Sequence, residues 1–106
     1  MLDYIYNSET NVLKFNFQGK LDTTASIGFR PEIDKLLTEM MAGSHKLPLS
    51  VNFDFQVVDF ITSAFVGICV STAKKVGKIN FSIANTNPFI KRTFKIAGLD
   101  RELNVS

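Results

Sequence analysis

The chain has 106 residues, enough for one domain with a hydrophobic core and too few for two. Apolar residues make up 45% and charged residues 21%, with ten phenylalanines, which excludes a disordered chain. The net charge of +2 is unevenly distributed, because residues 1–60 carry five Lys/Arg against eight Asp/Glu and residues 61–106 carry seven against two. We interpret the basic second part as a solvated face or as a surface for an acidic partner. No nucleic-acid motif accompanies it, so direct nucleic-acid binding is not expected.

No apolar run approaches the ~18–20 residues that span a bilayer, and the first residues carry acids rather than the basic stretch of a signal peptide. The single cysteine, Cys69, cannot form an internal disulfide or a cysteine-based zinc site. We therefore expect a cytoplasmic protein without membrane insertion, metal or other cofactor.

The first elements alternate in polarity as strands do. Residues 2–6 alternate weakly and indicate a short edge strand, whereas residues 12–21 alternate clearly. Turn-forming residues occupy positions 7–11, so the two strands are predicted to form a hairpin. Gly19, late in the second strand, indicates a bulge or the close approach of another backbone.

A helix is predicted next. Residues 22–26 offer several helix caps, but the clear helical pattern starts at Pro31, which suits a first turn and would kink a helix that began earlier. Gly43 is a natural C-terminal stop. The apolar stripe of this helix consists of Ile33, Leu36, Leu37, Met40 and Met41.

The central strand is expected within residues 47–60, with a turn near residues 54–58. The hydroxyl residues Thr62 and Ser63 follow, and then a second apolar segment ends in two lysines and Gly77. The β-branched residues in this segment would also suit a strand. We predict a helix after Ser63, because the run is too long for one more strand and ends as helices do.

The last elements continue the alternation of strand and helix. Residues 78–84 indicate a strand, Asn87 caps a helix over residues 88–97 that Gly98 closes, and residues 102–105 suit a short final strand. The inner stripe of this helix is expected to hold Ile90, Phe94 and Ala97. Helices between successive strands indicate an α/β fold, in which an N-terminal hairpin is followed by parallel crossovers.

Ser63 lies at the predicted boundary between the central strand and the next helix. Serine is favoured there because its side-chain oxygen can accept a hydrogen bond from a backbone N–H that lacks a helical partner. The same N–H groups and the helix dipole favour negative charge. Ser63 is therefore interpreted either as a cap or as a residue suited to carry a phosphate.

Four segments resemble, in order and approximate spacing, the motifs of STAS domains, the family of the anti-sigma-factor antagonists. They are residues 19–22 (GKLD), 60–65 (FITSAF), 87–94 (NPFIKRTF) and 97–100 (AGLD). The resemblance implies a single STAS-like domain over residues 1–106. Its α/β fold would have a mixed sheet of four or five strands with about three helices, and it would not be an enzyme.

The resemblance also implies a mode of action. Domains of this family dock onto an ATPase-fold serine kinase, often an anti-sigma factor, and phosphorylation of the motif serine breaks the complex. Ser63 stands at the position of that serine, so a partner-switching regulator is implied, since a phosphate adds about −1.5 to −2 charges to the interface. Its partner-binding residues would be Asp22, Thr23, Thr24, Thr62, Ser63, Ala64 and Phe65.

The central motif departs from the family pattern at three positions. Thr62 stands in place of an Asp, Ala64 in place of a hydroxyl residue and Phe65 in place of a glycine. Thr62 would cap the helix instead of the Asp. Phe65 would either fill the core or form part of an altered docking surface.

The missing acid motivates a second hypothesis, in which the chain is a cytoplasmic STAS subunit docked on the ATPase of a lipid or anion transporter. Constant docking of that kind requires no phosphorylation. An enzyme or small-ligand binder is the third class. The sequence has no paired histidine and carboxylate, nucleophile elbow, metal-ligand spacing or glycine-rich phosphate loop that would favour it.

Overall fold

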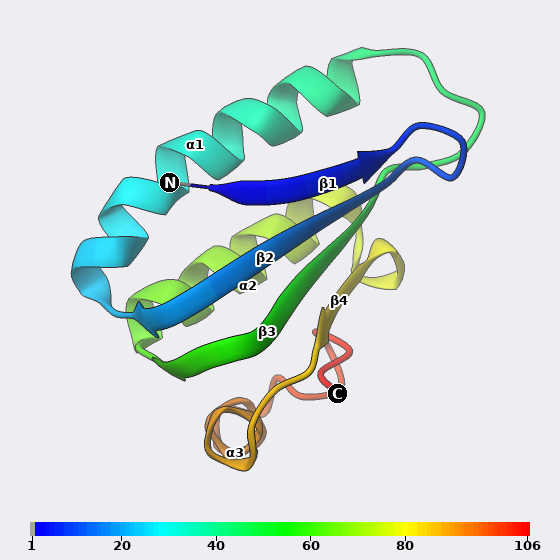
Figure 1. Cartoon of the computed structure of the whole chain (residues 1–106). Coiled ribbons are helices and arrows are strands. Elements are labelled where there is room, and N and C mark those ends of the chain that lie inside the picture. Colours follow the sequence, from blue (N-terminus) through cyan, green and yellow to red (C-terminus); the bar gives the residue numbers. More distant parts are fainter. Residues whose placement is uncertain (1) are drawn as a thin grey trace.

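The computed structural model describes residues 2–106, so Met1, the first residue of the expected domain, lies outside the described residues. Its strands are β1 (Asp3–Asn7), β2 (Val12–Leu21), β3 (Ser50–Ile61) and β4 (Phe81–Ala84). Its helices are α1 (Thr23–Ala42), α2 (Ser63–Val76), α3 (Pro88–Ile96) and the short 3₁₀ helix η1 (Lys78–Asn80). Figure 1 shows their arrangement.

The four strands form one mixed sheet in the order β1-β2-β3-β4. β1 and β2 are antiparallel, whereas β2 with β3 and β3 with β4 are parallel. The predicted fold class and the N-terminal hairpin followed by parallel crossovers are thus confirmed. Both crossovers advance in the same direction across the sheet, and crossovers of one handedness then place their helices, α1 and α2, on the same face.

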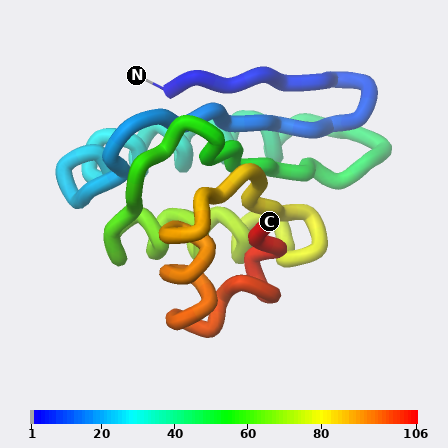
Figure 2. Tube along the Cα trace, turned by 60° about the horizontal axis from the view of Figure 1, so that its bottom comes forward, coloured from blue at the N-terminus to red at the C-terminus, as the bar shows by residue number. Residues whose placement is uncertain are grey.

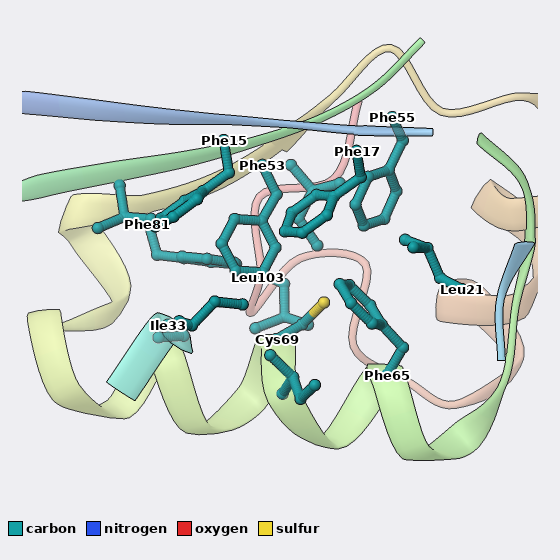
Figure 3. Close-up of a cluster of buried hydrophobic side chains, with 14 of the residues drawn as sticks. Phe15, Phe17, Leu21, Ile33, Phe53, Phe55, Phe65, Cys69, Phe81 and Leu103 are labelled. Carbon is teal, nitrogen blue, oxygen red and sulfur yellow. The ribbon is translucent and has the colours of Figure 1, made fainter. Parts of the chain in front are cut away.

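The core lies between this face of the sheet and the two helices. Figure 3 shows phenylalanines of β2, β3 and β4 pointing toward α2. The ring centroid of Phe17 lies 5.0 Å from that of Phe53 and 5.1 Å from that of Phe65, in edge-to-face geometry that aromatic pairs prefer. Cys69 is fully buried beneath these rings, and burial raises the pKa of its thiol.

The opposite face of the sheet is polar and carries one buried carboxylate, that of Asp54. The side chain accepts hydrogen bonds from the Gln56 N–H at 2.9 Å and from Asn85 Nδ2 at 3.0 Å, and Lys14 Nζ lies 3.3 Å away. Burial acts to raise the pKa of Asp54, but the three donors outweigh it, so the pKa lies below its ordinary value of 3.8.

We predict that Asp54 contributes to acid sensitivity. A carboxyl whose pKa is lowered by folding stabilises the native state above the unfolded pKa of 3.8, and that contribution is lost as the pH falls through the folded pKa. Asp54→Asn should lower the free energy of unfolding at pH 7 by about 1.5–3 kcal/mol. The decline of that free energy between pH 5 and 2, measured by urea titrations, should be shallower in the variant. An equal decline in both proteins would contradict the prediction.

Helix α1 begins at Thr23, so the predicted start at Pro31 was wrong. Asp22 caps the helix, and Pro31 lies inside it. Proline cannot bond the carbonyl of the residue four positions earlier, which is Ile27. Both residues are exposed, so water can satisfy that carbonyl, and the helix continues to the predicted stop at Gly43.

Strand β3 runs unbroken through residues 54–58, where a turn was predicted. Its pairing with β2 instead shifts by one residue at two places, after the pairs Asn16–Asp54 and Gly19–Val58. These irregularities interrupt the polar alternation, and a turn was inferred wrongly from that interruption. The bulge predicted at Gly19 is confirmed, with a φ of +77° that favours glycine.

The C-terminal segment differs from the prediction in detail. Residues 102–105 form no strand within the described chain, and Val105 makes only an isolated bridge to Ile83. Ala97 is the exposed C-cap of α3 rather than part of its inner face. Ile90 and Phe94 are buried as predicted.

Candidate functional site

The amino termini of α1 and α2 lie side by side where β2 and β3 end. The Thr62 N–H donates to the Leu21 carbonyl at 3.1 Å, which joins the two strand–helix connections. We call residues 21–26 and 61–65 the α1/α2 junction. In open α/β sheets, binding sites form beyond the carboxyl ends of the parallel strands, and the junction is at that edge.

The first half of the junction is ordered by Asp22. Its Oδ1 accepts from the Ala25 N–H at 2.9 Å, and its carbonyl accepts from the Ser26 hydroxyl at 2.7 Å. Thr23 and Thr24 are exposed on the first turn of α1. Asp22 is thus occupied in capping, while the two threonines face solvent.

The second half presents Ser63. This residue is the first of α2 and is exposed, so its hydroxyl lies in solvent at a helix amino terminus. The Thr62 carbonyl accepts from the N–H groups of Phe65 at 3.0 Å and Val66 at 3.1 Å, which starts the helix. The predicted strand-to-helix boundary at Ser63 is confirmed.

The prediction that the Thr62 side chain caps α2 was wrong. Among residues 2–106 it makes no capping hydrogen bond, and its Oγ1 lies 3.5 Å from the Leu21 carbonyl. The side chain is directed toward the neighbouring connection instead of the first turn of α2. The N–H groups of that turn beside Ser63 therefore have no cap from the residue that replaces the family's Asp.

Phe65 is not part of the surface. It has no solvent exposure, because the third residue of α2 lies on the face of the helix toward the sheet, where its ring meets Phe17 and Phe55. Of the two alternatives for Phe65, core filling is correct, and its assignment as a partner-binding residue was wrong. Ala64 beside it is partly exposed.

The predicted cap of α3 is confirmed, since the Asn87 Oδ1 accepts from the Ile90 N–H at 2.8 Å. Two neighbouring features were missed from the sequence. Asn87 Nδ2 also donates to the Val58 and Asp59 carbonyls at 3.1 Å each, which fixes α3 against the end of β3. A groove also opens where β2 extends beyond the start of β1. It is lined by Asp3, Asn16, Phe17, Gln18, Lys20, Leu21, Ala25, Phe29 and Val57. The unequal lengths of the two hairpin strands were the signal for this groove.

We predict that the two N-cap residues, Asp22 and Thr62, differ in their effect on stability. Asp22→Ala should lower the free energy of unfolding by about 1 kcal/mol, because the Ala25 N–H loses its acceptor. Thr62→Ala should change it by less than about 0.5 kcal/mol. Thr62→Asp should raise it by about 0.5–1 kcal/mol by supplying the absent cap. Denaturant titrations of the three variants test this, and an equal loss in Asp22→Ala and Thr62→Ala would refute it.

The comparison with protein families agrees with this geometry. The family model described as STAS domain matches residues 5–106. The chain belongs to the STAS domain family. No curated protein matches its sequence.

Solved structures share the fold of this STAS domain at low sequence identity. The anti-sigma factor antagonist SpoIIAA in its unphosphorylated form is 15% identical, with a TM-score of 0.75 over 100% of this chain and 88% of that chain. An anti-sigma factor antagonist from Mycobacterium paratuberculosis is 19% identical, with a TM-score of 0.75 over 99% and 85%. The phosphorylated form of Bacillus SpoIIAA is 15% identical, with a TM-score of 0.67 over 100% and 91%.

Residues 2–106 contain no group of three or more His, Cys, Asp or Glu side chains that could hold a metal ion. None of the helices in that part of the chain combines the length and the apolar character needed to cross a membrane.

Proposed function

We propose that this STAS domain is a non-catalytic, cytoplasmic partner-switching regulator. It docks onto an ATPase-fold serine kinase of the anti-sigma-factor type and is released when Ser63 is phosphorylated. The observation that carries the proposal is the exposed Ser63 at the first position of α2, in a chain of the STAS family.

The docking face is the exposed part of the α1/α2 junction. Thr23, Thr24, Thr62, Ser63 and Ala64 contact the partner, whereas Asp22 holds the first turn of α1 in place through its hydrogen bonds. The groove beside β2 extends the face with the exposed Val57. The groove is lined by both polar and apolar side chains, and the hydroxyl groups of the junction lie beside it. Such a mixed surface suits a protein interface, in which a desolvated centre is surrounded by polar contacts.

Phosphate at residue 63 acts on the complex rather than on the fold. The helix dipole and the first-turn N–H groups of α2 favour a phosphate in the free domain. In the complex, the same charge of about −1.5 to −2 would have to be desolvated against the docked partner. SpoIIAA, which has this fold, is known in unphosphorylated and phosphorylated forms.

Phosphate transfer tests the proposal. A serine kinase of the ATPase fold that binds this domain is incubated with it and ATP, and the modified residue is located by mass spectrometry. We expect phosphate on Ser63 of the wild type and none on Ser63→Ala. Binding without any transfer to residue 63 would overturn the regulatory part of the proposal.

A second function is favoured by Thr62, which replaces the family's acid and supplies no side-chain cap to α2. The domain would then be a subunit that stays docked on the ATPase of a lipid or anion transporter. Co-purification with such an ATPase, unchanged by Ser63→Asp, would decide for this alternative.

A further inference from the structure

The β1 edge of the sheet is open. Within residues 2–106, β1 pairs only with β2, and Figure 2 shows it as the outermost strand with no other segment beyond it. Its sequence, DYIYN, contains no lysine, proline or glycine. Edge strands without such protective residues present unpaired N–H and C=O groups that can template another strand.

Strand β1 exposes two large hydrophobic side chains, those of Tyr4 and Ile5. Ile5 is 64% exposed and stands opposite Lys14 on the polar face of the sheet. Tyr4, which is 42% exposed, lies on the helical face, where its ring centroid is 6.0 Å from that of Phe15. Tyr6 shares that face, and its hydroxyl donates to Asn11 Oδ1 at 2.6 Å.

We propose that β1 pairs with β1 of a second copy of this chain, antiparallel and about a twofold axis at Ile5. In this register Ile5 faces Ile5 of the second copy, Tyr4 faces Tyr6, and Asp3 faces Asn7. Isoleucine therefore faces isoleucine and tyrosine faces tyrosine across the two strands, and the one charged residue of β1 faces a neutral amide. A register centred on Tyr4 would place Asp3 opposite Ile5 instead.

Self-pairing accounts for both properties of the edge, the free backbone groups and the exposed apolar side chains. The twofold axis is perpendicular to the sheet, so the helices of both copies cover the same face of one eight-stranded sheet. β2 and β3 of the two copies then run in opposite directions. The two α1/α2 junctions lie at opposite ends of the dimer, and each Ser63 stays free, so the dimer does not depend on the proposed function.

The interface is small, because only one short strand from each copy contributes its backbone. Interfaces that bury less than about 1,200 Å² are generally weak and transient. We therefore expect a dimer that exchanges rapidly and is populated at high protein concentration.

Disulfide trapping tests the register. A twofold axis at residue 5 brings the two Cα atoms to the separation of directly paired strand residues, about 4.5–5.5 Å, which a disulfide can span. The native Cys69 is buried, so Ile5→Cys adds the accessible thiol. Val57→Cys is the matched control, since Val57 is 62% exposed on β3 away from the β1 edge. We expect mild oxidation to link Ile5→Cys into dimers at least about tenfold faster than Val57→Cys, as unpaired exposed thiols meet only by collision.

Sedimentation equilibrium provides the second measurement and needs no cysteine. The apparent mass of the wild type should rise toward that of a dimer as its concentration approaches about 1 mM, the range of weak association. Ile5→Lys should remain monomeric, because two like charges would meet at the twofold axis. It should stay folded and lose no more than about 1 kcal/mol of stability, since residue 5 is exposed and the new charge stands opposite Lys14. Three results would each overturn the proposal: a wild type that stays monomeric throughout this range, equal rates of disulfide trapping in the two cysteine variants, or a dimer that persists in Ile5→Lys.

Discussion

Phe65→Ala should lower the free energy of unfolding by about 3–5 kcal/mol, the largest stability effect we expect from a single substitution. The ring is completely buried and lies within 5.1–6.5 Å, between centroids, of four other rings: those of Phe17, Phe29, Phe53 and Phe55. Truncation removes the transfer energy of the ring and leaves a cavity that the surrounding rings can only partly fill. Since domains of this size are stable by about 5–15 kcal/mol, the variant should be close to unfolding at moderate denaturant concentrations.

Urea titration of Phe65→Ala measures this effect. Phe89→Ala is the matched control, because the ring of Phe89 at the start of α3 is 72% exposed, and its loss should change stability by no more than about 0.5 kcal/mol. Phe65→Gly, which restores the family residue, should cost about 1 kcal/mol more than Phe65→Ala, since glycine is the weaker helix former. A loss below 1 kcal/mol in Phe65→Ala would show that the core does not depend on this ring.

Ser63→Asp should weaken binding to the ATPase-fold partner by at least about 100-fold. A carboxylate at this exposed position would be desolvated in the interface, and misplaced charge at an interface costs several kcal/mol. The stability of the free domain should not decrease, because a negative charge in the first turn of α2 interacts favourably with the helix dipole. Loss of binding without loss of stability is the expected signature.

Calorimetric titration of the partner measures the change in affinity, and denaturant titration of the same sample confirms folding. Ser63→Ala should bind within about threefold of the wild type, since a small exposed hydroxyl contributes little. Ser44→Asp, which places the same charge in the exposed loop after α1, should also bind normally. Equal binding by Ser63→Asp and wild type would exclude the switch and favour constant docking on a transporter ATPase.

Sequence patterns predicted the elements in which local and tertiary preferences agree. The limits of β2 and the start of α2 followed from polar alternation and from hydroxyl residues before an apolar run. The start of α1 was missed because a proline inside a helix is tolerated where the carbonyl four residues earlier, here that of Ile27, can bond to water. Only the fold determines that exposure.

The candidate site was predictable in position but not in the orientation of its side chains. The motif around Ser63 placed an exposed hydroxyl correctly. It could not show that the Thr62 hydroxyl turns toward Leu21 or that Phe65 turns into the core, because both depend on the packing of α2 against neighbouring elements. Gly19 indicated one of the two irregularities between β2 and β3, whereas the shift after the pair Asn16–Asp54 was hidden, since it arises from the pairing of the two strands.

The buried Cys69 makes opening of the domain core measurable by a chemical reaction. Its thiol is sealed beneath the aromatic rings and burial raises its pKa, so a maleimide in solution can react only when the core opens. The rate at which Cys69 is alkylated therefore reports how often the core opens. The same rate can be compared between the free domain and the domain bound to a partner.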